Sequence, residues 1–331
     1  MTTLSILDLV PVPAGSTMRE AIEISMQAAE QADEQGYERL WFAEHHNVPG
    51  LASSATALLI DRAASRTSRI RVGAGGVMLP NHAPLAVAEQ YGTLVQFHGD
   101  RIDLGLGRAP GTDPLTAQLL ARSSAEPDAF AQNIADIQAW TGPTTTATSR
   151  IGAFVAQGTK VPMWVLGSSL NGARLAAQLG LPFSVASHFA PFQFAQALEL
   201  YRREFTAEAP TAQIDSPRTM VGVNVVVADT ESEARFQFSV LQQMFVGILR
   251  GQRDLLPEPT DIEQAVPADL LARVNQTLSI SAVGTPGQVR EQLREIAAST
   301  QADELICVSY FHDPAKRFAS QRMLAEAWSA S

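Results

Sequence analysis

Strand-like and helix-like segments alternate along the whole chain, and this alternation limits the folds that the chain can adopt. Eight short, nearly continuous apolar runs are each followed by a segment with the spacing of an amphipathic helix. Such runs are typical of parallel strands that helices cover on their outer face. The runs are Leu4–Val10, Arg39–Glu44, Ile70–Leu79, Arg101–Arg108, Val161–Leu166, Phe183–Ser187, Met220–Ala228 and Leu305–Tyr310.

Eight strand–helix units predict a closed (β/α)8 barrel, the TIM-barrel fold of the α/β class. The alternative is an open, doubly wound sheet, which needs a G-x-G-x-x-G turn after its first strand. Residues 7–18 read LDLVPVPAGSTM and lack that turn. We therefore predict one barrel domain over residues 1–331. Residues 251–281 contain several prolines, and we expect them to form an irregular insertion after the seventh strand.

Charge and cysteine content restrict the partners and the compartment. The 331 residues carry a net charge of −10, and no basic patch stands out, so nucleic acid is not an expected partner. The single cysteine, Cys307, allows no intrachain disulfide, which suits a reducing cytoplasm. The chain starts without a signal-peptide pattern and has no apolar stretch approaching about 20 residues, so we expect a cytoplasmic protein without membrane contact.

The carboxyl ends of the strands carry the active site in barrels of this kind. The second run ends in Glu44, His45 and His46. Adjacent strand residues point to opposite sides, so only one histidine can enter the barrel mouth, which argues against a metal site. One such histidine suits a general base or a hydrogen-bond donor, although a structural role stays open for both. Other strand ends offer Asp8, Ser187, His188, Asn224, Tyr310 and His312.

Two further motifs indicate a flat, phosphorylated cofactor. The small residues of Gly73–Gly76 weaken a strand but let a ligand approach its backbone, unless they mark a bulge or close helix packing. Arg108 and the turn Gly167-Ser168-Ser169 combine a guanidinium with hydroxyl and N–H donors before a helix, which suits a phosphate group. The alternative for Arg108 is a surface salt bridge.

Four stretches resemble the bacterial luciferase-like monooxygenase family, and in particular its single-chain, luciferase-type flavin oxidoreductases. They are WFAEHHNVPGLASSA (41–55), RVGAGGVMLPNHAPLAVAEQ (71–90), GDRIDLGLGRAPGTD (99–113) and VLGSSLNGARLAAQLGLPF (165–183). The resemblance covers nearly the whole chain. It is specific for the family and says little about the substrate.

The resemblance implies a barrel that uses reduced FMN, supplied by a separate flavin reductase, and O2 to oxidise a small apolar substrate through a C4a-peroxyflavin. It assigns acid–base work to His45, with Glu44 in the same catalytic group, and no metal. Gly75 and Gly76 match a cis peptide packed on the flavin, while the phosphate positions are Arg108, Gly167, Ser168 and Ser169. It also implies that residues 251–281 form a mobile active-site loop and that the chain forms a homodimer.

The chain departs from the light-emitting members of this family at one position. Those members carry a reactive cysteine where Gly107 stands, so we expect no luminescence. Phe189, Phe192 and Phe194 are expected either to line an apolar substrate pocket or to belong to the core. Three other functions stay open: an oxidoreductase that uses the deazaflavin F420, a flavin-binding paralogue without turnover, and a metal-dependent hydrolase.

Overall fold

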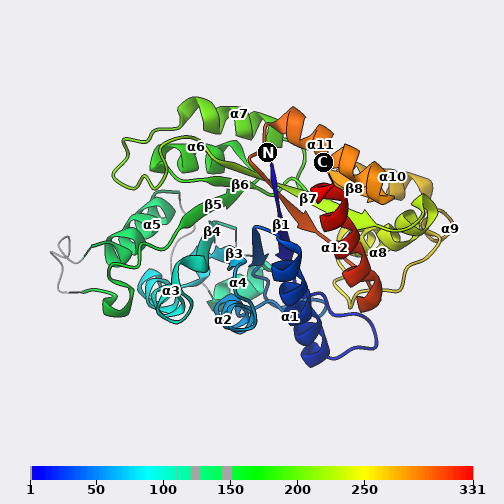
Figure 1. The fold of residues 1–331 in the computed structure, drawn as a ribbon, viewed down its shortest axis with the longest axis horizontal. Helices are drawn as coiled ribbons and strands as arrows, with labels where there is room; N and C mark the ends of the chain where they lie inside the picture. Colours follow the sequence, from blue (N-terminus) through cyan, green and yellow to red (C-terminus); the bar gives the residue numbers. More distant parts are fainter. Residues whose placement is uncertain (1, 110, 121–126, 144–150, 331) are drawn as a thin grey trace.

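Eight parallel strands form a closed barrel in the computed structural model, which describes residues 2–109, 111–120, 127–143 and 151–330 (Figure 1). Closure is shown by β9, which pairs with both β1 and β7, and by β6, which pairs with β7. The predicted TIM barrel is therefore confirmed. The barrel strands are β1 (Thr3–Asp8), β2 (Arg39–Phe42), β3 (Arg71–Met78), β4 (Ile102–Gly107), β5 (Met163–Gly167), β6 (Phe183–Val185), β7 (Thr219–Val227) and β9 (Glu304–Val308).

Helices surround the strands (Figure 1). Thr17 caps the start of the first helix, where its hydroxyl accepts the Glu20 N–H, and Gly36 caps its end in the left-handed conformation with φ 79°. No helix in the described part of the chain is long and apolar enough to cross a membrane. The helices are α1 (Met18–Gln35), α2 (Thr56–Arg66), α3 (Pro84–His98), α4 (Pro114–Leu120), α5 (Pro127–Thr141), α6 (Leu170–Leu179), α7 (Phe194–Glu204), α8 (Glu231–Leu249), α9 (Ile262–Ala265), α10 (Ala268–Thr277), α11 (Pro286–Thr300) and α12 (Pro314–Ser329). The short 3-10 turns in the described residues are η1 (Leu79–Asn81), η2 (Gly99–Arg101) and η4 (Phe154–Ala156).

The segment between β7 and β9 differs from the prediction. An additional strand, β8 (Ser281–Gly284), lies beside the second half of β7 outside the barrel ring, and α11 follows it. The expectation that residues 251–281 are irregular is confirmed for residues 251–261 and wrong for the rest, which contains α9 and α10. Pro267 directly precedes α10, a place where a fixed φ is compatible with a helix start. Side chains of α10, such as Val274, are buried in the cluster that includes residues of α8.

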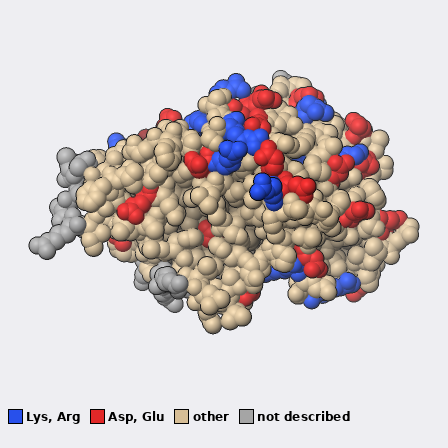
Figure 2. All heavy atoms as spheres, turned by 90° about the horizontal axis from the view of Figure 1, so that it is seen from below, with Lys and Arg blue, Asp and Glu red and all other residues tan. Residues whose placement is uncertain are grey.

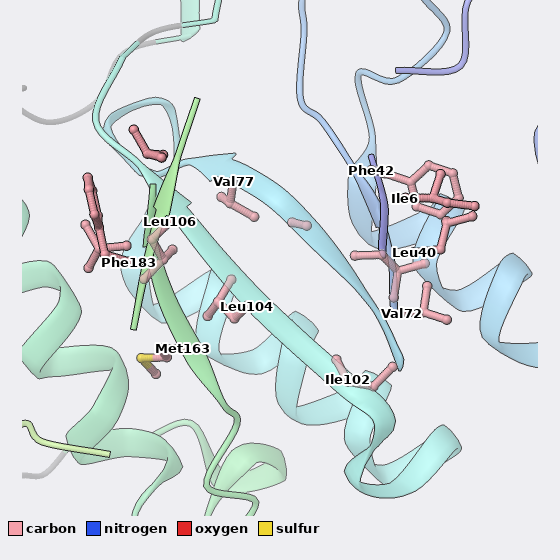
Figure 3. Close-up of a cluster of buried hydrophobic side chains, with 14 of the residues drawn as sticks. Ile6, Leu40, Phe42, Val72, Val77, Ile102, Leu104, Leu106, Met163 and Phe183 are labelled. Carbon is pink, nitrogen blue, oxygen red and sulfur yellow. The ribbon is translucent and has the colours of Figure 1, made fainter. Parts of the chain in front are cut away.

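Alternation along each strand separates two apolar layers. Side chains such as Leu40, Val72 and Leu104 pack outward against the helices, as Figure 3 shows for part of this layer. The intervening residues, including Trp41 and Trp164, point into the barrel. Their rings meet edge to face with centroids 5.4 Å apart. The two Trp residues therefore fill the middle of the barrel.

Below the two Trp rings, a buried ion network fills the amino-terminal end of the barrel. Arg39 lies 2.6 Å from carboxylate oxygens of both Asp103 and Glu304, and its side chain is 3% exposed. The guanidinium carbon also lies 5.2 Å from the Trp164 ring centroid. Burial alone would lower the pKa of Arg39, but the two carboxylates outweigh this effect and raise it. Arg39 is therefore charged, and its charge is compensated.

Candidate active site

A cavity of about 1260 Å³ lies at the carboxyl ends of the strands, where barrels of this class place their sites. This exceeds the roughly 300–1,000 Å³ of a typical small-molecule pocket, so there is room for more than one small ligand. The end of α8 and the connection that follows it form one wall. Among the lining residues are His45, Gly75, Gly107, Arg108, Gly167, Ser168, Ser169, His188, Asn224, Arg250, Arg253 and Tyr310.

The strand alternation continues past the end of β2. His45 lines the cavity together with Trp41 and Ala43, whereas His46 does not. His45 Nδ1 lies 3.3 Å from the carbonyl oxygen of Gly111, which places the ring proton on Nδ1 and leaves a lone pair on Nε2. Burial lowers the pKa of His45, and the positive charge of Arg253 acts in the same direction against the Gly111 carbonyl. At neutral pH His45 is therefore a neutral group that can accept a proton.

Glu44 lies outside the cavity wall and is only 1% exposed. Its Oε1 accepts hydrogen bonds from His46 Nε2 at 2.9 Å and from His82 Nε2 at 2.8 Å. Burial favours a raised Glu44 pKa, but the hydrogen bonds from His46 and His82 outweigh it and lower the pKa. Glu44 thus supports its neighbours and does not itself reach the cavity.

His82 completes this cluster, and it was not among the strand-end residues predicted from the sequence. The ligand atoms of Glu44, His46 and His82 lie within 4.8 Å of one another, a grouping that could hold a metal ion. Hydrogen bonds already occupy the three atoms that would bind such an ion. His82 follows β3, the neighbour of β2, and that position at an adjacent strand end was the signal available in the sequence.

The Gly75–Gly76 peptide is cis, and Gly75 lines the cavity. A Cβ atom on Gly75 would lie 2.7 Å from Leu7 Cδ1, and one on Gly76 would lie 2.8 Å from the carbonyl oxygen of Gly105. The Gly76 contact is with backbone, so that position requires glycine, whereas a side chain at Gly75 would have to displace the end of the Leu7 side chain. The result is a bare strip of backbone on β3, against which a flat ring can pack.

Arg108 and the turn Gly167-Ser168-Ser169 all line the cavity, as the sequence analysis grouped them. Ser169 caps α6, and its hydroxyl accepts the Gly172 N–H at 3.3 Å. The ten-residue helix α6 therefore directs its N-terminal N–H groups and positive dipole end toward this wall. Among the described residues, Arg108 has no acidic ion-pair partner. The donor set fits a phosphate group.

The remaining strand-end residues divide between the cavity and the outer layer. His188, Asn224 and Tyr310 line the cavity. Asp8 is instead paired with Arg317 at 2.6 Å, Ser187 donates to the Gly222 carbonyl, and His312 contacts the Ala14 carbonyl.

Of the three phenylalanines, Phe189 lines the cavity, Phe192 is 69% exposed, and Phe194 packs on the outer core. Cys307 is buried, and burial raises the pKa of its thiol to about 12.

Comparison with known proteins agrees with the fold and identifies the family. The family model of the luciferase-like monooxygenases matches residues 2–304, and the chain belongs to this family. It is 44% identical to the luciferase-like monooxygenase of Escherichia coli K12, over 96% of this chain and 94% of that protein. It is also 44% identical to Bacillus subtilis YvbT, over 99% and 97% of the two chains. The crystal structure of apo-MsnO8 superposes with a TM-score of 0.87 at 34% identity, covering 100% and 99%.

More distant solved structures share the barrel and differ in cofactor. One is the oxygenating constituent of 3,6-diketocamphane monooxygenase of Pseudomonas putida in complex with FMN, with a TM-score of 0.71 and 19% identity over 100% and 99% of the chains. Another is an F420-dependent secondary alcohol dehydrogenase, with a TM-score of 0.68 and 12% identity over 99% and 98%. At these identities the likeness shows the fold alone.

Proposed function

We propose that this protein is a monooxygenase that uses reduced FMN and O2 to oxidise a small, predominantly apolar organic molecule, without emitting light. One observation carries the proposal. The phosphate-binding wall of Arg108 and α6, the bare β3 backbone at Gly75 and the proton acceptor His45 all face one large cavity. The first group suits the phosphate of a flavin cofactor, the second suits its flat ring, and the third suits a proton transfer. No other cluster of the described residues combines them.

The residues present fit FMN. Arg108, Ser168 and Ser169 would hold its phosphate, and Gly75 and Gly76 would contact its ring. Bound reduced FMN would supply the two electrons needed to activate O2. His45 is placed to hold or accept a proton at Nε2, while Glu44 fixes the neighbouring His46. The connection that follows α8 covers one side of the cavity and would limit its exposure to water.

The apolar character of the substrate follows from the side chains around the cavity. Leu7, Leu9, Val185, Phe189 and Tyr310 contribute to the lining, and such side chains favour an apolar body. A separate flavin reductase would deliver the reduced cofactor, as the resemblance to the luciferase-like family implies. A cytoplasmic location agrees with this supply of reduced cofactor.

F420 is the second candidate cofactor, because the same barrel uses it in relatives and the phosphate-binding groups would accept it. Titration of the purified protein with FMN and with F420, followed by fluorescence, distinguishes the two. We expect tighter binding of FMN. Exclusive binding of the blue-fluorescent F420 would contradict the monooxygenase and favour a hydride-transfer enzyme.

Turnover is tested by rapid mixing of protein-bound FMNH2 with air-saturated buffer. We expect the protein to change the oxidation kinetics of FMNH2 seen in free solution, and His45→Ala to alter this effect. Kinetics identical to those of free FMNH2 would contradict the monooxygenase and favour a flavin-binding paralogue without turnover.

We also propose a homodimer formed through the helices of the first barrel units. Phe97 at the end of α3 is 71% exposed, and Phe154 of η4 is 77% exposed. The two elements are adjacent, because Gln96 donates to the Val155 carbonyl. In Figure 2 the charged side chains crowd the centre and right of the face, and few lie on the left, the side of α3 and α5 in Figure 1. Exposed aromatic side chains in a weakly charged region favour association.

A further inference from the structure

His188 is a buried polar group of the cavity to which the proposed function gives no role. It follows β6, lines the cavity and is 7% exposed. Its Nδ1 is buried and has no hydrogen-bond partner among the described residues. A buried polar atom without a partner costs roughly 1–3 kcal/mol, so the placement of this ring needs a physical reason.

The position of the ring is closely determined by its neighbours. A Cβ atom on Gly222 of β7 would lie 2.3 Å from His188 Nδ1, so only glycine leaves room for the imidazole. Asn224 Nδ2 donates to the His188 carbonyl at 2.7 Å and holds the backbone. The Phe189 ring meets the imidazole edge to face at 4.8 Å. Nδ1 is buried against β7 and has no hydrogen-bond partner. This does not apply to Nε2, which remains available to the cavity that His188 lines.

The protonation of His188 follows from this packing. Burial lowers its pKa to about 3, and the nearby His45 acts in the same direction, so the ring is neutral near pH 7. A neutral imidazole carries a single proton. A buried N–H without an acceptor is rarer in proteins than an unsatisfied lone pair, which favours the proton on Nε2.

We propose that His188 is a neutral hydrogen-bond donor whose Nε2–H binds a carbonyl oxygen of the molecule held in the cavity. The inference rests on the proposed function. Carbonyl oxygens occur on the isoalloxazine ring of FMN and on ketone or aldehyde substrates, and the test below separates these two sources. His188 would orient the ligand, while the proton is moved by His45, the histidine that leaves a lone pair toward the cavity.

Nuclear magnetic resonance of the full chain labelled with 15N-histidine tests the donor directly, because the sequence has only six histidines. We expect the His188 proton to stay on Nε2 between pH 5.5 and 8.5. Its resonance should move downfield on addition of FMN if the acceptor is the flavin. If the acceptor is the substrate, it should move only when 2-octanone is added to the FMN-loaded protein.

Two outcomes overturn the inference alone: a proton on Nδ1, or no response of His188 to either addition while flavin fluorescence shows bound FMN. Failure of FMN to bind at all would overturn the proposed function, and the inference with it. The two failures are therefore distinguishable in one experiment.

Matched variants provide a second readout. His188→Gln keeps an N–H donor, whereas His188→Phe keeps a ring and removes the donor. We expect His188→Phe to lower the affinity for the ligand to which His188 responds, FMN or 2-octanone, by about three- to tenfold. We expect His188→Gln to change that affinity by no more than about twofold. Equal losses in both variants, with unchanged thermal unfolding, would indicate a packing role and contradict the donor. If neither variant folds, the labelled wild-type protein still decides.

Discussion

His82 Nε2 lies 2.8 Å from Glu44 Oε1, and this contact joins the ends of β3 and β2 outside the cavity wall. The Glu44 hydrogen bond raises the pKa of His82, although partial burial opposes it. The hydrogen bonds from His46 and His82 together lower the pKa of Glu44 against its own burial. The two shifts make the stability of this corner of the barrel depend on pH.

Glu44→Gln tests that dependence. His82, with a raised pKa in the folded state, stabilises the fold fully below its ordinary value of 6.5, and this contribution is lost as pH rises through the raised pKa. Glu44, with a lowered pKa, stabilises above 4.5 and loses this as pH falls. We expect Glu44→Gln to cost about 1–3 kcal/mol of unfolding free energy at pH 5.5 and less at pH 8.5. Urea unfolding measures both values, and equal losses would contradict the pairing.

Arg253→Gln should raise the pKa of His45. The positive charge of Arg253 disfavours a second positive charge on the imidazole, so its removal makes protonation easier. Arg250→Gln is the matched control, because Arg250 lines the same cavity but does not contribute to the shift of His45. A titration of His45 by nuclear magnetic resonance gives the pKa in each variant. An unchanged pKa in Arg253→Gln would show that the two groups do not interact.

Arg108→Gln should weaken the binding of FMN and leave the binding of riboflavin, which lacks the phosphate, unchanged. A charge-assisted hydrogen bond contributes about 1.5–3 kcal/mol, which corresponds to an approximately ten- to 150-fold loss of FMN affinity. Arg174→Gln on the exposed face of α6 serves as control, since Arg174 pairs with Glu204 away from the cavity. Fluorescence titrations with both flavins give the affinities. Parallel losses for FMN and riboflavin would place Arg108 elsewhere on the ligand.

Phe97→Asp should convert the proposed dimer to a monomer, because a buried charge in an apolar interface is strongly unfavourable. Phe236→Asp on α8 is the control at another exposed aromatic position, 42% exposed, on a different helix. Light scattering after size-exclusion chromatography gives the mass. A monomeric wild-type protein, or a dimer that survives Phe97→Asp, would contradict this interface.

The barrel and the direction of His45 could be predicted from local sequence. Eight apolar runs specify parallel strands, and a period of two sends His45 and His46 to opposite sides. The prediction of residues 251–281 failed from α9 onward, because a proline such as Pro267 can stand just before a helix as well as in a loop. Local composition does not show that Val274 is buried in the same apolar cluster as residues of α8.

Contacts between distant strands could not be predicted. Arg39, Asp103 and Glu304 are separated by up to 265 positions, and nothing near any of them in the sequence indicates a buried ion network. The same holds for His82 with Glu44 and for His188 with Gly222, which meet only when the barrel closes. These pairings follow from strand order and register, which a single sequence does not display.

The ion network around Arg39 and the paired rings of Trp41 and Trp164 also determine how molecules can leave the protein. Because these side chains fill the barrel below the cavity, the cavity is closed at its base and opens only at the carboxyl ends of the strands. Every ligand of this site must therefore enter and leave at the strand ends, because the opposite end of the barrel is closed by side chains.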